Sequence, residues 1–265
     1  MIKDEDIIFI TTTIFSECLE LQQSQIKKYF PNSKSIIVDG SDKSLWPNSM
    51  FKWIDSVKNS NEKYFVLIDE DCFLVNKEEI LNTLNLLENN THDIIGCPDG
   101  YHPFRTCNPI VINPFLLFGR VSDVKEKIKI DFYNLKYKIK SLPGLYQKGH
   151  HYEWSNSAGI KYKHIYKETF IYPHPILSTF YFQDGKEPYY CFFWYLKEQG
   201  FNFGYLFPFM DEKLISTNPK INESSKEMAI HIWESRNMTT SQKLFGKTAK
   251  ERFELAKNYI SNLNI

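Results

Sequence analysis

Paired cysteines and a charge surplus are both missing from this 265-residue chain. Its five cysteines are scattered, and no two form a Cys-x-x-Cys pair. Such spacing is atypical of a disulfide framework or a zinc ribbon and favours a reducing compartment. The 32 Lys and Arg residues balance 32 Asp and Glu residues. Non-specific nucleic-acid binding depends on a basic surplus, so the composition argues against a nucleic-acid partner.

Long hydrophobic runs are also missing. No stretch reaches the length of about 18 apolar residues that a membrane-spanning helix needs. The N-terminal segment MIKDEDIIFITTT places three acids before a short apolar run, whereas a secretory signal begins with basic residues. The sequence therefore predicts a cytoplasmic protein.

Hydrophobic residues make up 42% of the chain, which excludes the low-hydrophobicity composition of disordered proteins. Aromatic residues contribute 16%, and many of them lie in the second half. The length fits one large domain or two small ones. We expect a folded core that is rich in aromatic rings.

The first hundred residues alternate between buried-strand patterns and helical patterns. Continuous apolar or β-branched runs predict strands at residues 7–13, 35–39, 64–69 and 93–98. Amphipathic spacing predicts helices at 16–30, 49–59 and 76–90. This order is typical of an α/β fold with a mostly parallel central sheet and helices on both faces.

The pattern is less regular after residue 100. Residues 101–120 are expected to form a loop, a short strand and the start of an apolar helix. Later strands are predicted at 167–174, 201–208 and 228–233, and later helices at 187–200 and 239–263. No internal repeat and no low-complexity linker interrupts the chain. One domain with two lobes and a seam near residue 100 is the predicted organisation.

An acidic triplet, Asp69-Glu70-Asp71, follows the third predicted strand. Ligands of open α/β sheets bind beyond the carboxyl ends of the strands. Three adjacent acids repel one another, and a divalent cation that bridges to phosphates would neutralise them. A solvated acidic turn that caps the following helix is the alternative. The context after YFVLI favours a metal site.

The first half resembles the GT-A fold of nucleotide-sugar glycosyltransferases over about residues 5–120. The Asp-x-Asp motif formed by Asp69 and Asp71 carries most of this resemblance. It implies that Asp71 binds Mn²⁺ or Mg²⁺ and that Asp69 holds the metal or the ribose. It also implies donor contacts, for which the candidates are Thr11, Thr12, Thr13, Asp39 and Glu70.

The second half matches the GT-A pattern more loosely. Enzymes of this fold have an acidic motif that begins a helix beneath the acceptor, but their Glu-Asp pair is missing here. Asp184 and Glu187 are the acids near that predicted helix start, and either is a candidate general base. His231, in MAIHIW, matches a late histidine that completes the metal or diphosphate site. A histidine packed in the core is the alternative for His231.

The resemblance implies a domain spanning residues 1–265. Residues 1–100 would form the nucleotide-sugar half, 101–238 the acceptor-side half and 239–265 a C-terminal amphipathic helix. The implied activity is metal-dependent transfer of a sugar from a nucleoside-diphosphate sugar to a hydroxyl of a glycan or lipid-linked acceptor. Surface polysaccharide or glycolipid synthesis, at the inner face of the membrane, is the expected setting.

Three other functions compete with this hypothesis. A phosphatase of the haloacid dehalogenase type also places Asp-x-Asp after an apolar strand, although normally after the first strand and before Gly-Thr. A non-catalytic nucleotide-sugar-binding protein is compatible with the missing Glu-Asp pair. A nucleotidyltransferase usually has a Gly-rich phosphate loop, and TTTIFSE contains no glycine.

The C-terminal segment mixes lysines with apolar residues. A basic amphipathic helix is able to contact an anionic membrane. Glu251 and Glu254 dilute the positive charge. Packing against the domain, or against a second copy in a homodimer, is therefore preferred to membrane contact.

Overall fold

The structure is a computed structural model of the 265-residue chain. It describes residues 1–14, 16–40, 52–89, 92–98, 111–129, 193, 196–197, 199–233 and 238–263. The description of the fold below refers to these residues. The predicted strand at 167–174 lies outside them, as does most of the predicted helix at 187–200.

The main sheet is mixed and largely parallel, and among the described residues it has the strand order β2-β1-β3-β6-β5-β7. Strand β1 pairs in parallel with both β2 and β3, and β5 pairs in parallel with β7. Only β6 runs against its two neighbours within this part of the sheet. The strands are β1 (Ile7–Thr13), β2 (Lys34–Asp39), β3 (Tyr64–Ile68), β5 (Ile94–Pro98), β6 (Ile112–Arg120) and β7 (Phe203–Tyr205).

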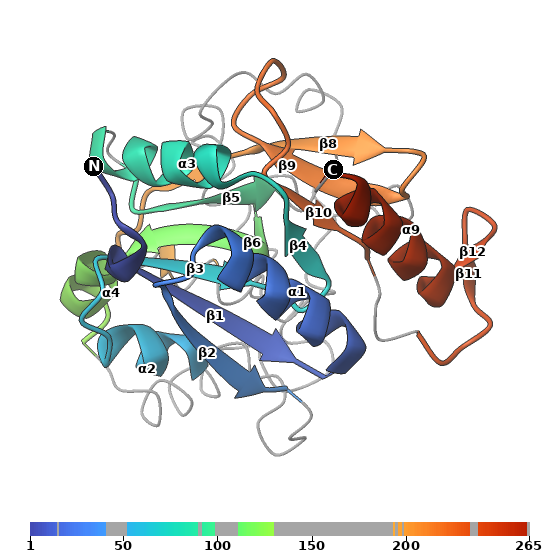
Figure 1. The fold of residues 1–265 in the computed structure, drawn as a ribbon. Helices are drawn as coiled ribbons and strands as arrows, with labels where there is room; N and C mark the ends of the chain where they lie inside the picture. Colours follow the sequence, from blue (N-terminus) through green and yellow to red (C-terminus); the bar gives the residue numbers. More distant parts are fainter. Residues whose placement is uncertain are drawn as a thin grey trace, which may run out of the picture.

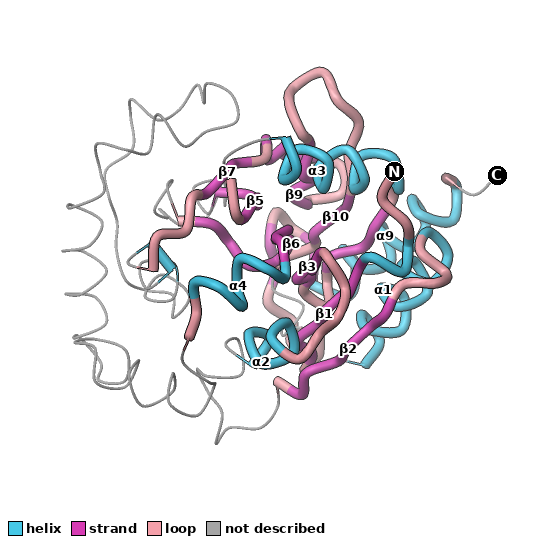
Figure 2. The backbone as a smooth tube through the Cα atoms, turned by 90° about the vertical axis from the view of Figure 1, so that its left-hand side faces the viewer, coloured by secondary structure: helices cyan, strands magenta, loops and turns pink. Residues whose placement is uncertain are grey.

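Helices cover both faces of this sheet, as the sequence predicts (Figures 1 and 2). On one face, Ile7 and Phe9 of β1 join a core with α1 and α3, whereas Trp53 of α2 stacks on Phe65 on the other. This alternation follows from the two-residue period of a strand that is buried on both sides. The elements are the 3-10 turn η1 (Asp4–Asp6) and the helices α1 (Ser16–Tyr29), α2 (Lys52–Lys58), α3 (Lys77–Asn89) and α4 (Val121–Lys127).

Strand β6 corrects the prediction for residues 101–120. The segment expected to be a short strand and a helix start is a nine-residue strand in the middle of the sheet. Proline has no N–H to donate to a ladder, so Pro114 argues against a central strand. The register against β5 shifts between the pairs Gly96–Leu117 and Pro98–Ile112, and Pro114 lies within this irregularity. Proline is tolerated at such bulges.

A second sheet extends the fold beyond the carboxyl end of β3. Its order, within the described residues, is β4-β10-β9-β8, and the pairs that these strands form are antiparallel. The strands are β4 (Cys72–Leu74), β8 (Phe207–Asp211), β9 (Ser216–Lys220) and β10 (Ala229–His231). Strand β4 follows the acidic triplet directly, so the two sheets meet at the triplet.

The C-terminal segment packs on this second sheet. Helix α9 (Ala249–Asn262) begins later than the predicted start at 239, because β11 (Lys243–Leu244) and β12 (Lys247–Thr248) form a hairpin first. Positive φ angles at Phe245 and Gly246 make the tight turn. Phe253 of α9 joins the core that Phe73 and Ile230 form. The helix thus packs against the domain, one of the two arrangements that the sequence favours over membrane contact.

No helix within the described parts of the chain is long and apolar enough to cross a membrane.

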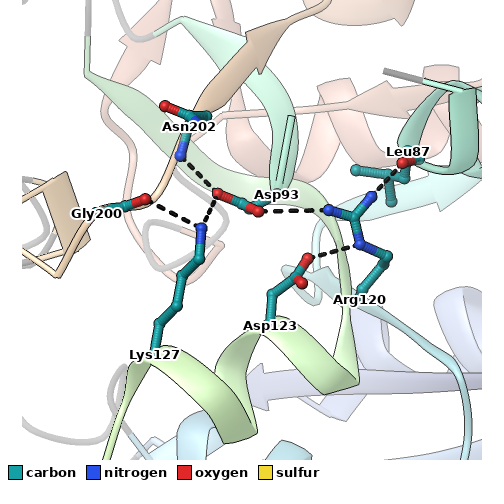
Figure 3. Close-up of polar contacts among 7 residues, drawn as sticks. All are labelled: Leu87, Asp93, Arg120, Asp123, Lys127, Gly200 and Asn202. Carbon is teal, nitrogen blue, oxygen red and sulfur yellow. Dashed lines mark hydrogen bonds and ion pairs between the residues drawn. The ribbon is translucent and has the colours of Figure 1, made fainter. Parts of the chain in front are cut away.

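A partly buried ion network joins α4 to the start of β5, the end of β6 and the segment before β7 (Figure 3). The Asp93 carboxylate pairs with Arg120 at 3.3 Å and with Lys127. It also accepts a hydrogen bond from the Asn202 backbone N–H at 2.7 Å. Asp93 lies just before β5 and Arg120 ends the antiparallel β6, so this network occupies the edge opposite the acidic triplet.

Candidate metal centre

The acidic triplet forms the turn between the buried strand β3 and strand β4. Two backbone hydrogen bonds fix this turn. The Asp69 N–H donates to the Phe115 carbonyl at 2.9 Å, and the Cys72 N–H donates to the Asp69 carbonyl at 3.0 Å. A turn held at both ends presents its side chains in a defined direction.

His231 is far from the triplet in sequence but lies beside it in the fold. It ends β10, where it pairs with Cys72 of β4 in antiparallel register. The next residue, Ile232, donates its N–H to the Asp71 carbonyl at 3.1 Å. The imidazole Nε2 consequently lies 3.4 Å from Asp71 Oδ1. One ligand atom each from Asp69, Asp71 and His231 lie within 4.8 Å of one another.

The donor set fits a divalent transition metal. Two carboxylates and an imidazole supply oxygen and nitrogen ligands, a combination that suits Mn²⁺. Asp71 is 6% exposed and His231 is 8% exposed. Two carboxylates this close together, that of Asp71 being buried, are costly to ionise without a cation. Their distances and burial make these three residues the best candidate ligands in the described part of the chain.

Two cysteines near the triplet have raised pKa values. Burial raises the pKa of the Cys18 thiol, and the charges of Asp71 and Glu70 raise it further. Burial also raises the pKa of Cys72, with added effects of Asp71 and Asp69. Neither thiol is therefore a reactive thiolate near neutral pH.

The Glu70 carboxylate contacts the connection between β1 and α1 and does not belong to the cluster of ligand atoms. Its carboxylate accepts a hydrogen bond from the Ile14 N–H at 2.6 Å and another from the Thr13 hydroxyl. Glu70 itself is buried. Through these bonds it couples the acidic turn to the end of β1.

The predicted donor-binding residues of β1 and β2 lie at this edge of the sheet in different environments. Thr11 is fully buried, and its hydroxyl is hydrogen bonded to Gln22, whose Nε2 lies 2.9 Å away. Thr12 and Thr13 are half-buried at the end of β1. Asp39 is exposed, ends β2 and lies opposite Thr13. Thr12, Thr13 and Asp39 thus border the site, and Thr11 supports it from inside.

Both candidate bases, Asp184 and Glu187, lie outside the described residues. Their roles remain predictions.

Two residues that the sequence did not single out are connected to the cluster. Gln22 of α1 donates to the Asp69 carbonyl at 3.2 Å. Phe115 of β6 stacks on His231, with ring centroids 4.1 Å apart. A glutamine within an amphipathic helix gives no signal, and Phe115 follows Asn113-Pro114, which masks the strand.

No protein-family model matches the chain, and no curated protein does either. Solved structures do match. The mannosyltransferase PcManGT from Pyrobaculum calidifontis, in complex with GDP-Man and Mn²⁺, is 12% identical, with a TM-score of 0.35 over 62% of this chain and 64% of its own. A glycosyltransferase involved in glycosylation of the major capsid of PBCV-1 is 13% identical, with a TM-score of 0.35 over 51% of this chain and 66% of its own.

Both of these matched proteins are glycosyltransferases. This chain spans slightly less than two thirds of each of their lengths. TM-scores of 0.35 carry no argument about chemistry, so the function has to be argued from the geometry of the site.

Proposed function

We propose that the chain is a metal-dependent glycosyltransferase that moves a sugar from a nucleoside-diphosphate sugar to a hydroxyl acceptor. The observation that carries this proposal is the convergence of Asp69, Asp71 and His231 from two sheets. They meet beyond the carboxyl end of β3, in a sheet where β1, β2 and β3 are parallel. Nucleotides bind α/β sheets at this edge.

The ligand set favours Mn²⁺ over Mg²⁺, because Mg²⁺ takes oxygen ligands, whereas a transition-metal ion also accepts an imidazole nitrogen. When bound, the cation would neutralise the diphosphate and make it a better leaving group. Asp69 and Asp71 would hold it with carboxylate oxygens, and His231 with Nε2. The part of the protein is to hold these three side chains together in a partly dehydrated site.

The remaining residues at this edge are suited to the nucleotide. Thr12 and Thr13 offer hydroxyls at the end of β1, and Asp39 offers an exposed carboxylate one strand further. We assign them to the nucleoside part of the donor. Glu70 contributes indirectly, by holding Thr13 and Ile14 beside the acidic turn. Asp184 or Glu187 would be the base that takes the proton from the acceptor hydroxyl.

A glycan or lipid-linked acceptor, and work in surface polysaccharide or glycolipid synthesis, belong to the same proposal. So do a cytoplasmic location at the inner face of the membrane and a homodimer. They rest on the resemblance of the sequence to GT-A enzymes, and no contact in the described residues bears on them.

The test is a thermal-shift panel of UDP-, GDP- and CMP-sugars, each with and without Mn²⁺, on the wild type and on Asp71→Asn. Asparagine keeps the shape of the side chain and removes its charge. A ligand that binds only the native state raises the unfolding free energy by about 2.7 kcal/mol at 100 times its Kd. We expect one nucleotide class to stabilise the wild type with Mn²⁺, and Asp71→Asn to lose both this stabilisation and transfer to acceptors.

Glu212→Gln is the matched control, because Glu212 is exposed and distant in sequence from the triplet. It should respond to Mn²⁺ and nucleotide as the wild type does. Full transferase activity in Asp71→Asn would contradict the proposal. A phosphoenzyme at Asp69, formed with no nucleotide, would indicate a phosphatase. Nucleotide binding without hydrolysis or transfer would indicate a binding protein.

A further inference from the structure

Phe115 covers one face of the His231 imidazole. The two ring centroids are 4.1 Å apart, and the ring planes differ by 5°. Both residues are more than nine-tenths buried. A flat ring packed face to face in a buried site prevents the imidazole from turning about its Cβ–Cγ bond. The stack therefore fixes the direction in which Nε2 points.

The backbone of the same residue holds Asp69. The Phe115 carbonyl accepts the Asp69 N–H at 2.9 Å, immediately after the last β3–β6 pair, Ile68 with Leu116. Phe115 also lies in the part of β6 where the register against β5 shifts. Bulges of this kind re-aim side chains next to functional sites. One residue thus contacts Asp69 through its main chain and His231 through its side chain.

Hydrogen bonding gives His231 little other support. A histidine that ligates a metal usually donates its second ring N–H to a carboxylate, a carbonyl or a water, which fixes the ring. The Nδ1 atom of His231 is buried and has no hydrogen-bond partner among the described residues. Its Nε2 faces Asp71 Oδ1. The aromatic stack does the orienting that a hydrogen bond does in other metal sites.

We propose that Phe115 is a positioning residue of the candidate metal centre, holding the His231 imidazole and the Asp69 backbone in the geometry that binds a divalent cation. The inference rests on the metal site of the proposed function. It adds that the affinity for the metal depends on a residue whose side chain has no atom able to ligate it.

The experiment measures Mn²⁺ affinity by calorimetry on the full chain, with Phe115→Leu, Phe115→Tyr and Phe118→Leu beside the wild type. Phe118 is equally buried on β6, so Phe118→Leu removes the same ring from the core without touching His231. Loss of outer support for a ligand typically weakens metal binding 10- to 100-fold. We expect at least a tenfold loss in Phe115→Leu, a change below about threefold in Phe118→Leu, and recovery in Phe115→Tyr, which keeps the ring.

A second measurement separates positioning from general stability. The Mn²⁺ concentration for half-maximal transfer should rise in Phe115→Leu, while the KM for the donor at saturating Mn²⁺ stays near that of the wild type. Where Phe115→Leu does not fold, Phe115→Met fills more of the space and takes its place. Wild-type Mn²⁺ affinity in a folded Leu or Met variant, or equal losses in the Phe118 variant, would overturn the inference.

The measurements distinguish a failure of the role of Phe115 from a failure of the proposed metal site. Mn²⁺ binding that Asp71→Asn abolishes and Phe115→Leu leaves unchanged refutes the role of Phe115 alone. A wild type that binds no Mn²⁺ refutes the metal site itself, and the role of Phe115 with it.

Discussion

The three adjacent acids have different contacts: Asp69 and Asp71 belong to the candidate metal centre, whereas Glu70 does not. It lies between Asp69 and Asp71 in sequence, yet its carboxylate accepts hydrogen bonds from the Ile14 N–H and the Thr13 hydroxyl. Hydrogen bonds to a charged acceptor contribute about 1.5–3 kcal/mol each. The middle acid of the triplet therefore holds the start of the β1–α1 connection in place.

Replacing Glu70 by glutamine should loosen that connection. Both hydrogen bonds end on the same oxygen, Oε2, so the amide can still accept them but without the negative charge that strengthens them. A loss of about 1.5 kcal/mol would speed exchange of the Ile14 amide roughly tenfold. Hydrogen exchange followed by mass spectrometry measures this directly. As a control, Glu78→Gln, on the exposed side of α3, should leave exchange at Ile14 unchanged. An unchanged exchange rate in Glu70→Gln would refute the role of Glu70 in holding the β1–α1 connection.

The sequence predicted which residues could form the metal centre, because their chemistry is local. Asp69 and Asp71 follow an apolar strand, which selects them as metal ligands, whereas His231 was named from the resemblance to GT-A enzymes. The structure brings these three together. The roles of Glu70 and Phe115 depend instead on contacts between strands distant in sequence. Periodicity contains no information on such contacts.

Secondary-structure elements with a strong local sequence signal were predicted, and those that depend on distant contacts were not. Most strands and helices of the first hundred residues were predictable because their apolar periods are strong, but the three-residue strand β4 was not among the predictions. Strand β6 was not, since Pro114 contradicts a central strand unless a bulge accommodates it. The hairpin before α9 was also missed. Its turn uses Phe245 at a positive φ, a conformation that a phenylalanine rarely adopts.

Helix α9 gives a prediction about capping. The Thr248 hydroxyl accepts the Glu251 N–H at 3.2 Å, and the Glu251 carboxylate accepts the Thr248 N–H at 2.6 Å. Loss of a threonine N-cap typically costs about 1 kcal/mol. Thr248→Ala should lower the free energy of unfolding by about that much in urea titrations. Thr248→Ser keeps the hydroxyl and should remain near the wild type; equal losses in both variants would argue against the cap.

The capping box also has a pH dependence. The Thr248 N–H holds the pKa of Glu251 below its usual value of 4.5. A carboxyl with a lowered folded pKa stabilises the fold above its unfolded pKa, and this contribution is lost as pH falls through the folded pKa. Glu251→Gln should therefore be less sensitive to acid than the wild type below about pH 4.5. Identical acid titrations of the two proteins would contradict this assignment.

The Asp93 network joins segments that are far apart in sequence. Asp93 precedes β5, Arg120 ends β6, Lys127 ends α4, and Asn202 precedes β7 (Figure 3). The Lys127 ammonium also donates to the Gly200 carbonyl at 3.0 Å. The network thus fixes the start of β7, which brings residues beyond 200 into the main sheet.

Removing Asp93 should loosen this junction more than removing a surface ion pair loosens its surroundings. Asp93→Ala removes a carboxylate that is more than nine-tenths buried from Arg120 and Lys127, although Arg120 keeps its ion pair with Asp123 at 2.7 Å. Breaking a buried pair costs about 3–5 kcal/mol, and the partial exposure of the two cations reduces this to about 2–3 kcal/mol. Lys63→Ala breaks an exposed pair with Asp6 and should cost less than about 1 kcal/mol.

Urea unfolding of both variants tests the size of the effect, and hydrogen exchange tests its location. Loss of the Asp93 carboxylate should raise exchange in β7 first, because the Asn202 N–H loses its acceptor. The candidate metal centre lies at the opposite edge of the sheet, so the Mn²⁺ affinity that we propose should change little as long as the protein is folded. Equal costs for Asp93→Ala and Lys63→Ala would mean that the network is no stronger than a surface pair. A large loss of Mn²⁺ affinity would instead mean that β7 and the metal centre are coupled through β5 and β6.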